Sequence, residues 1–331
     1  MIDVVIDLLG SDTNEVMLFD GIIEALKEKD DLHIIAVGKN QELKTKIKNL
    51  GYLITRFDFI DAVDEITNHI NPLDALKLKN SSMYVGLEYV KKHNASFITC
   101  GSTGSLLVLS SVLVGRNRKV RPALASLLQG ANKQFILLDS GANIVCKSEH
   151  YLDFAYLGSS YMEARGIINP KCYLLSVGAE ASKGTDVLKD AYQLLKSDKN
   201  INFLGNIEGN HLLESDADII LADGYSGNIA LKTIEGSVKT IIDQLDDYMN
   251  KRKLNRLALQ GFRKYTLDHF DYTDKGGAIM LGMNNLILKG HGAASAETIY
   301  NLINQAYNII KSDLVTKTNK IFEDKYGKRD Q

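Results

Sequence analysis

Residues 95–114 read ASFITCGSTGSLLVLSSVLV, and this stretch shows the unit from which the chain is built. A short apolar run over 95–99 meets a turn with two glycines, and an apolar helical pattern follows over 104–114. This order is typical of a buried strand that enters a helix through a tight loop. The sequence therefore predicts a βα unit, in which the start of the helix offers free backbone N–H groups to an anion.

The same alternation continues on both sides of this unit. Apolar runs predict strands at 2–6, 32–38, 95–99, 133–138, 171–177, 217–222 and 286–288. Helical patterns occupy 15–29, 81–93, 104–114, 149–166, 183–197 and 226–250. Strands that alternate with helices favour an α/β fold with a mostly parallel, buried sheet. We expect one domain over residues 1–331, ending in a polar tail at 315–331 that frays.

Composition narrows the class of protein. Apolar residues make up 45% and charged residues 24% of the chain, as in an ordinary soluble globular protein. A net charge of −2 gives no field that would hold nucleic acid. The three cysteines lack metal-ligand spacing, so we expect no metal site and a reduced, cytoplasmic setting. The sequence shows no basic leader, and its apolar runs fall short of the ~20 residues that a membrane helix needs.

Motifs of several common enzyme classes are absent. The chain has no Walker-type phosphate loop, and no Gly-x-Gly-x-x-Gly follows the first strand. These absences disfavour a nucleoside triphosphatase and a dinucleotide-binding enzyme. The chain also lacks the His-Glu-x-x-His of zinc proteases and the Gly-x-Ser-x-Gly of serine hydrolases.

Glycines gather directly after the predicted strands. In a parallel sheet these positions share one edge, where ligands bind, and glycine lets backbone N–H groups approach a ligand closely. The positions are Gly10, Gly101 with Gly104, Gly141, Gly178, Gly224 with Gly227, and Gly290 with Gly292. Each loop alone fits a simple turn, but six together favour one shared anion pocket.

Two of these loops carry hydroxyl or ammonium groups suited to phosphate. Ser102 and Thr103 add hydroxyl donors at the start of helix 104–114, where they also fit plain helix caps. Lys183 lies where a glycine-containing loop turns into a helix. An ammonium there suits a phosphate dianion, and the alternative is a lysine that only faces solvent.

Three further loops carry a histidine, amides or a carboxylate. His291 lies between two glycines, which suits a proton donor or phosphate ligand better than a structural core histidine. Asp223 and Asn228 lie between a strand and a long helix, where they could orient phosphate or cap the helix. Asn143 repeats this arrangement after the strand at 133–138, with the same two alternatives.

The loops resemble, in order through nearly the whole chain, those of the bacterial phosphate acyltransferases of phospholipid synthesis (PlsX). The matching segments are Asp7–Asp12, Ser81–Met83, Gly101–Gly104, Arg121–Leu124, Gly141–Asn143, Cys146 with Lys147, Lys183 with Gly184, Gly205 with Asn206, Glu208 with Gly209, Asp223 with Gly224, Gly227 with Asn228, Leu231–Gly236, Gly276–Ala278 and Gly290–Gly292. One such tripeptide means little, whereas the collinear set is highly specific.

The resemblance implies a fold, an activity and partners. The fold would be a three-layer α/β/α, Rossmann-like arrangement similar to isocitrate and isopropylmalate dehydrogenases, with a protruding helical hairpin near 238–270. The activity would be transfer of a fatty acyl group from acyl carrier protein to inorganic phosphate, giving an acyl phosphate for phospholipid synthesis. The resemblance also implies a homodimer and a reaction without nicotinamide or metal.

The resemblance further implies roles for single residues. Phosphate dianion is a competent nucleophile, so the site must hold it beside the thioester and stabilise the oxyanion. Lys183 would hold phosphate, and His291 would donate to the oxyanion or to the departing thiolate. The phosphate- and substrate-binding set would be Asp12, Gly101, Ser102, Thr103, Gly104, Asn143, Asp223 and Asn228. Cys100 and Cys146 fit packing or loop roles better than covalent catalysis.

Departures from the family pattern leave alternatives open. They fall in the loops, at Ser11, Ser102, Val145, Ala179, Ala181, Ala293 and Ala294. One alternative is a phosphate acetyl- or butyryltransferase that uses another thioester, such as coenzyme A. A second is a scaffold or regulatory member that has lost turnover, and a third is a dehydrogenase that binds a nicotinamide.

A basic segment predicts a docking surface. Residues 251–264 contain six basic residues and no acid, and apolar residues recur there at helical spacing. A basic amphipathic helix suits an anionic membrane surface or an acidic partner such as acyl carrier protein. We expect peripheral docking through Lys251, Arg252, Lys253 and Arg256. The alternative is a helix packed on its own domain or on a dimer mate.

Overall fold

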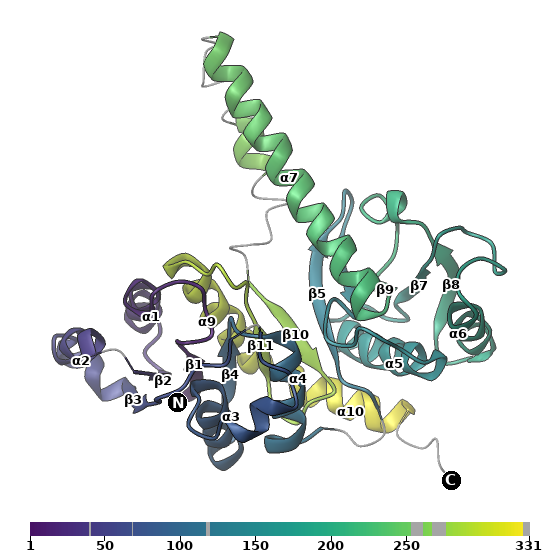
Figure 1. Cartoon of the computed structure of the whole chain (residues 1–331). Coiled ribbons are helices and arrows are strands. Elements are labelled where there is room, and N and C mark those ends of the chain that lie inside the picture. Colours follow the sequence, from purple (N-terminus) through teal and green to yellow (C-terminus); the bar gives the residue numbers. More distant parts are fainter. Residues whose placement is uncertain (40, 68, 117–119, 253–260, 267–275, 327–331) are drawn as a thin grey trace.

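A computed structural model shows one large sheet with helices packed on both faces (Figure 1). It describes residues 1–331 except 40, 68, 117–119, 253–260, 267–275 and 327–331. The sheet has the strand order β3-β2-β1-β4-β11-β10-β5-β6-β9-β7-β8. This three-layer α/β/α arrangement confirms the fold class expected from the sequence.

The strands are short and mostly buried, as in a sheet covered on both faces. Their bounds are β1 Ile2–Asp7, β2 Leu32–Gly38, β3 Phe57–Asp61, β4 Ser96–Thr99, β5 Ala123–Gln129, β6 Gln134–Leu138, β7 Lys171–Leu175, β8 Asn202–Ile207, β9 Ile219–Leu221, β10 Ala278–Leu281 and β11 Ile287–Lys289.

The helices connect these strands and cover them. Their bounds are α1 Glu15–Glu28, α2 Gln41–Lys48, α3 Ser82–His93, α4 Thr103–Leu113, α5 Ser148–Ala164, α6 Asp186–Ser197, α7 Gly224–Arg252, α9 Ala296–Lys311 and α10 Leu314–Tyr326. Short 3-10 helices lie at Gly51–Arg56, Asp74–Lys77 and Gly209–His211. Residues 261–266 are helical as well.

The sheet changes direction in its middle. The pairs β10–β11, β10–β5 and β5–β6 are antiparallel, and the other pairings of the described strands are parallel. The strands from β3 to β11 therefore point one way, and those from β6 to β8 point the opposite way. The expected mostly parallel sheet thus consists of two parallel halves joined through β10 and β5.

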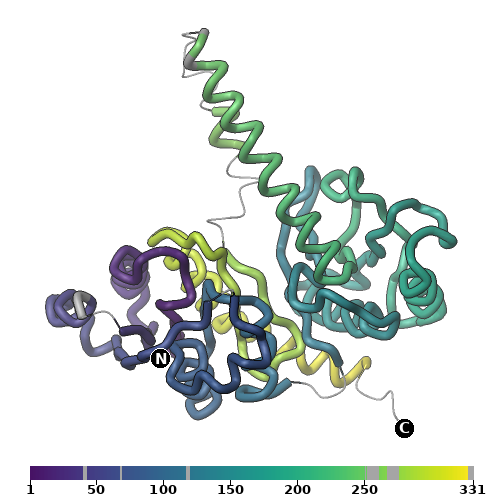
Figure 2. The backbone as a smooth tube through the Cα atoms, viewed as in Figure 1, coloured from purple at the N-terminus to yellow at the C-terminus, as the bar shows by residue number. Residues whose placement is uncertain are grey.

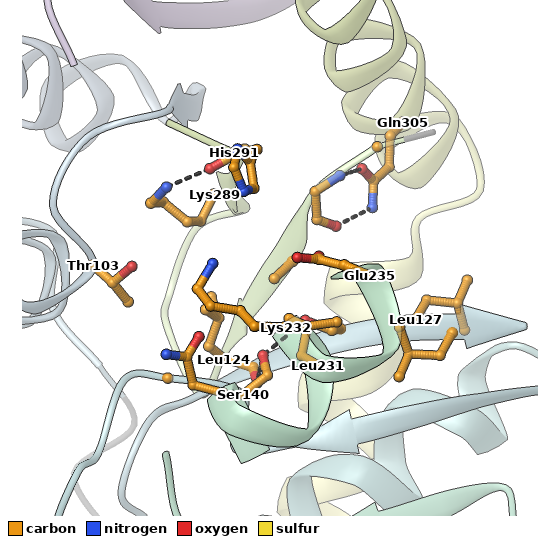
Figure 3. A pocket seen from close by; sticks show the side chains of 18 of the residues that line it. Thr103, Leu124, Leu127, Ser140, Leu231, Lys232, Glu235, Lys289, His291 and Gln305 are labelled. Carbon is orange, nitrogen blue, oxygen red and sulfur yellow. Dashed lines mark hydrogen bonds between the residues drawn. The ribbon is translucent and has the colours of Figure 1, made fainter. Parts of the chain in front are cut away.

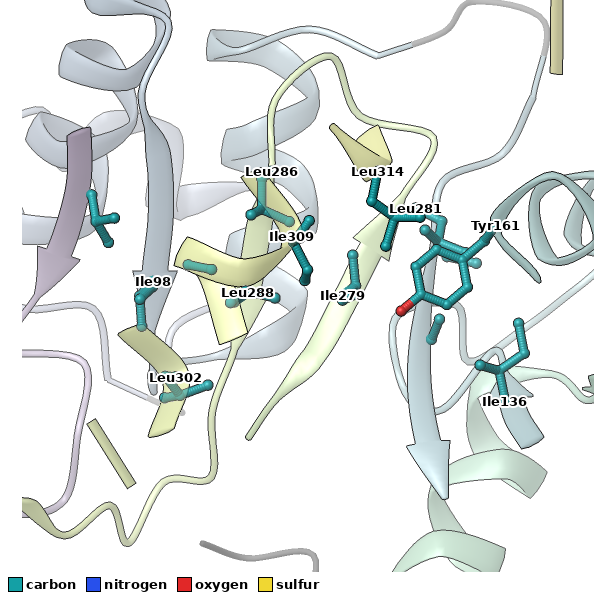
Figure 4. Close-up of a cluster of buried hydrophobic side chains, with 14 of the residues drawn as sticks. Ile98, Ile136, Tyr161, Ile279, Leu281, Leu286, Leu288, Leu302, Ile309 and Leu314 are labelled. Atoms are coloured by element: carbon teal, nitrogen blue, oxygen red, sulfur yellow. The ribbon is translucent and has the colours of Figure 1, made fainter. Parts of the chain in front are cut away.

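The two faces of the sheet have different cores. On one face, a single cluster runs from β1 and β4, under α1 and α9, to β6 and β9 under α5 and α10. Figure 4 shows part of this cluster, from Ile98 on β4 to Ile136 on β6. On the other face the core is divided into a cluster under α3 and α4 and a second cluster under α7. The gap between these two clusters is where the functional site lies.

Helix α7 projects far beyond the sheet (Figures 1 and 2). It has 29 residues, and its first turns pack over the sheet beside β6. Its outer part confirms a protruding helix near residue 238, while residues 253–260 and 267–275 of the expected hairpin lie outside the described residues. Within the described part of the chain, no helix is both long and apolar enough to cross a membrane.

The C-terminal segment differs from the frayed tail that we expected. Residues 314–326 form α10, which packs on α5, and the tail expected at 315–331 is therefore helical over most of its length. Phe322 and Tyr326 are buried at helical i, i+4 spacing, and the Tyr326 ring packs against Tyr156. The prediction was wrong because it gave more weight to the high charge of this segment than to its few apolar residues, which anchor the helix.

We predict that Phe322→Ala lowers the free energy of unfolding by about 3–5 kcal/mol, because a buried aromatic ring leaves a cavity when it is removed. Phe322 is only 2% exposed. Urea unfolding followed by circular dichroism measures the change. Lys320→Ala on the exposed side of the same helix is the control and should change stability by less than about 0.5 kcal/mol. Equal, small effects of both substitutions would show that α10 does not belong to the folded core.

Candidate active site

A cavity of about 550 Å³ occupies the gap between the two divided clusters. Leu124 belongs to the cluster under α3 and α4, and Leu128 to the cluster under α7. Both leucines line the cavity, and Ser126 lies between them on the same face of β5. The cavity thus opens where a polar residue interrupts the apolar face of the strand.

The sheet and α7 form two opposite walls of the cavity. Lys289 on β11 pairs with Ala278 on β10, and Ser126 follows on β5 in the same register. From α7, the lining residues are Asn228, Leu231, Lys232 and Glu235. Their spacing of three, four and seven residues from Asn228 places them on one face of the helix.

Loops supply the remaining walls. Thr103 begins α4, Ser140 and Gly141 follow β6, and Gly290–Gly292 follow β11. Together with Asn228 these residues come from four of the six glycine-containing loops that the sequence pointed to. The structure therefore brings residues from four of these six segments to one cavity, and the binding of an anion there stays a prediction.

The cavity is positively charged at one end. In Figure 3, Lys232 reaches up from α7 toward Lys289 and His291. Within the described residues, neither lysine makes an ion pair with a carboxylate. Two ammonium groups that face one cavity without acidic partners favour the binding of an anion.

Lys289 links two of the loops and still faces the cavity. Its Nζ donates to the carbonyl oxygen of Cys100, at 3.2 Å, and to that of Gly290. An ammonium has three N–H donors, so one remains for a ligand. Burial lowers the pKa of Lys289, and the nearby Lys232 ammonium lowers it further against the opposing effect of nearby acidic groups. A bound dianion would relieve both effects, because it stabilises the charged form.

The start of α4 reaches the cavity through Thr103. Ser102 is the N-cap, and its Oγ accepts a hydrogen bond from the Ser105 N–H at 3.5 Å. The capping alternative for Ser102 is therefore shown, while the next residue, Thr103, lines the cavity. Gly101 and Gly104 lie in the same loop but outside the lining.

The loop after β1 supports the His291 loop from behind. The Asp12 N–H and the Ser11 hydroxyl both donate to the Gly292 carbonyl oxygen, each at 2.9 Å. A Cβ atom at position 292 would lie 2.8 Å from the Asp12 carboxylate, so this close approach requires glycine. Asp12 thus packs beside the cavity loop and does not line the cavity.

His291 is exposed and lines the cavity. Its Nδ1 accepts a hydrogen bond from the Ala293 N–H at 3.3 Å. This contact leaves the proton of the neutral ring on Nε2, which can then donate to a ligand. The geometry fits the donor role that the sequence suggested.

Asn143 and Asp223 hold the walls of the cavity. The Asn143 amide donates to the Pro122 carbonyl oxygen at 2.9 Å and to the Asp139 carboxylate at 2.7 Å. Asp223 caps α7 by accepting from the Ser226 N–H at 2.7 Å. Neither residue lines the cavity, so for both the capping or structural alternative is the one observed.

Lys183 lies apart from the cavity. It is exposed on the loop after β7, and it is not among the lining residues. Five strand spacings separate β7 from β11 in the sheet, roughly 24 Å. The structure therefore does not bring Lys183 together with His291.

Sequence reasoning missed the two lysines that do line the cavity. Lys232 follows Asn228 by one helical turn within Leu231–Gly236, one of the segments that carry the family resemblance, and Lys289 directly precedes Gly290. Both therefore lay within segments already singled out, or next to one. The sequence analysis did not single out these two lysines because most lysines face solvent. Only the packing of α7 over the sheet brings them together.

Covalent and metal chemistry find no support in the described residues. Burial raises the pKa of Cys100 to about 11 and that of Cys146 to about 12, so both remain thiols at neutral pH. In the part of the chain that the structure describes, no cluster of histidine, cysteine or acidic side chains could hold a metal ion. The cavity is suited to binding and polarising an anion by N–H and ammonium groups.

Comparisons with known proteins show the family of the chain and its fold. A family model described as fatty acid synthesis protein matches residues 2–317. A phosphate acyltransferase of Petrotoga mobilis is 36% identical over 323 residues, covering 94% of this chain and 97% of the relative. One from Clostridium botulinum is 34% identical over 332 residues, covering 97% and 99%. A solved phosphotransacetylase from Streptococcus pyogenes shares the fold, with a TM-score of 0.61, 18% identity and 94% of each chain covered.

We predict that Lys232→Met and Lys289→Met each weaken phosphate binding about ten-fold or more, because each removes a charged donor from the cavity. Isothermal titration calorimetry measures the dissociation constants. Lys239→Met is the matched control, since Lys239 is exposed on α7 and lies outside the lining. In Lys232→Met the pKa of Lys289 should rise, so the alkaline loss of binding should move to higher pH. Unchanged affinity in both cavity variants would place the anion elsewhere.

Proposed function

The chain belongs to the fatty acid synthesis protein family and is a phosphate acyltransferase, and from this premise we propose that it moves a fatty acyl group from acyl carrier protein to inorganic phosphate. The observation that carries the proposal is the cationic end of the cavity. Lys232, Lys289 and His291 converge there beside the start of α4. This set of donors suits a phosphate dianion and the oxyanion that forms next to it.

In the proposed reaction, a phosphate oxygen attacks the thioester carbonyl carbon. The new C–O bond gives a tetrahedral oxyanion, which collapses as the C–S bond breaks and the thiolate leaves. Lys232, Lys289 and the N–H groups at Thr103 hold the phosphate. His291 donates from Nε2 to the oxyanion, and the departing thiolate takes up a proton from solvent. Holding the two reactants together supplies much of the rate enhancement, because phosphate needs no activation.

The alternatives find less support. The likeness to phosphotransacetylases is at the level of the fold, with 16–18% identity, so it favours no coenzyme A thioester. Against a scaffold without turnover, Lys232 and Lys289 both line one cavity and, among the residues that the structure describes, form no ion pair with a carboxylate, which suits the binding of an anionic substrate. The departures at Ser11 and Ser102 fit an intact site as well, since Ser11 supports the Gly292 loop and Ser102 caps α4.

The direct test is incubation of the protein with long-chain acyl carrier protein and phosphate. Acyl phosphate is trapped with hydroxylamine, and free carrier thiol is titrated in parallel. We expect the two products in equal amounts and only when phosphate is present. Turnover with acyl coenzyme A but not with acyl carrier protein would show that the acyl donor is a coenzyme A thioester and would contradict the proposal.

We predict that His291→Ala folds normally and lowers kcat by about 10²–10³, the usual effect of losing one oxyanion donor. His291→Gln, which keeps a side-chain N–H, should recover part of the rate. Lys183→Ala tests the expectation drawn from the sequence, and we expect a smaller loss because Lys183 does not line the cavity. Near wild-type turnover of His291→Ala would remove His291 from the proposed mechanism.

The proposal also includes a cytoplasmic homodimer that associates peripherally with membrane. Support for the membrane contact comes from the outer part of α7, where Ile241 and Tyr248 are 58% and 52% exposed. Lys251 and Arg252 follow, and Lys251 forms an ion pair with Asp247 on the same helix at 2.6 Å. Lys253 and Arg256 of the expected docking set lie outside the described residues. Apolar and basic groups on one projecting helix suit an anionic lipid surface.

We predict that changing Lys251, Arg252, Lys253 and Arg256 to Glu reduces sedimentation with anionic vesicles, because each basic residue near such a surface adds about 1 kcal/mol. The binding of the wild-type protein should fall at high salt. Acyl transfer in solution should remain, which shows that the variant is folded. Unchanged sedimentation would make this segment a structural or dimer contact.

A further inference from the structure

The cavity has a second, apolar end. Ala278 on the sheet and Leu231 on α7 face this part, and Leu128 continues it along β5. In Figure 3, Thr103 and Leu127 lie at opposite ends of the lining, with Lys232 between them. We propose that the acyl chain lies in this apolar end, over Ala278 and Leu128 and against Leu231, with its carbonyl group at Lys289 and His291.

The strand register shows in which direction the apolar end of the cavity extends from Lys289. Lys289 pairs with Ala278, and the next strand over carries Ser126 in the same row, roughly 10 Å from Lys289. Leu128 follows Ser126 by two residues on the same face, and its side chain points to the same side of the sheet. A chain that starts at Lys289 therefore crosses Ala278 first and reaches Leu128 further along β5.

Three of the polar side chains along this path, those of Ser126, Ser140 and Gln305, are hydrogen-bonded within the protein. The Ser126 and Ser140 hydroxyls contact each other at 2.7 Å, and Ser140 also donates to the Leu124 carbonyl oxygen at 3.0 Å. The Gln305 amide accepts from the Gly277 N–H at 2.7 Å and donates to its carbonyl oxygen at 2.9 Å. An apolar chain can lie beside groups that are already bonded without leaving any of them unsatisfied.

The charged residues of the lining favour the same orientation of the substrate. Glu235 lines the cavity from α7, one turn beyond Lys232 (Figure 3). Its carboxylate repels a phosphate dianion, whereas Lys232 and Lys289 attract it. Phosphate is therefore confined to the end at Thr103 and His291, and the other end is left to the uncharged chain.

The test measures kcat/KM for acyl carrier protein loaded with acyl chains of four, eight and sixteen carbons. The experiment rests on the proposed function, which turnover of the wild-type protein establishes first. Ala278→Leu and Leu231→Phe should lower kcat/KM for the sixteen-carbon chain about ten-fold or more, because added bulk in an apolar pocket discriminates on this scale. The four-carbon substrate should lose several-fold less than this, because a chain of four carbons ends close to Ala278 and does not reach the rest of the apolar end.

Two controls separate the outcomes. Leu188→Phe changes a half-buried leucine of α6 outside the cavity and should leave the chain-length profile unchanged. Phosphate affinity of Ala278→Leu and Leu231→Phe should match the wild type, which shows that the anion end is intact. An equal loss for all three chain lengths would assign this end to the pantetheine arm that all donors share, and it would overturn the proposal. An unchanged profile would overturn it too.

Discussion

The buried carboxylate of Asp139 holds together the part of the sheet on which the site depends. It has no exposed surface, and it accepts N–H bonds from Leu124, Gly141, Ala142 and Asn143 and from the Asn143 side chain, at 2.6–3.1 Å. Burying a charge is costly unless hydrogen bonds replace water, and five donors do so here. The contacts join the end of β6 to β5, where the sheet changes direction. Through Asn143, whose carbonyl oxygen accepts from the Gly224 N–H at 2.7 Å, they also fix the start of α7.

This junction explains why a cavity exists at all. One face of the sheet has a continuous core, whereas the other face is divided where β5 meets β10 and α7 crosses over them. Because Asp139 fixes both β5 and the start of α7, it sets the width of the gap between them. Lys232 on the helix and Lys289 on the sheet then face each other across that gap. The positive charge of the site is thus a consequence of how two halves of one sheet are joined.

The sequence predicted most of this fold because its strands are short, apolar and bounded by glycine or acidic residues. The runs at 2–6, 32–38 and 133–138 match β1, β2 and β6 to within a residue. Strands β3, β5, β8 and β10 were not predicted. In β10, Ala278–Leu281 follows a long polar stretch and carries no strand-like alternation. Of the site, the loops at Thr103 and His291 could be predicted from glycine spacing alone. Lys232 and Lys289 could not, because a single lysine gives no sign of the surface that it will face.

The central claim is that phosphate binds between α7 and the sheet, at the loops that carry Thr103 and His291. A crystal structure of the protein grown in saturating phosphate tests it most directly. The account predicts tetrahedral density within hydrogen-bond distance of Lys232, Lys289 and the backbone N–H groups at the start of α4. Density at the loop of Lys183, with the cavity free of anion at the same phosphate concentration, would contradict it.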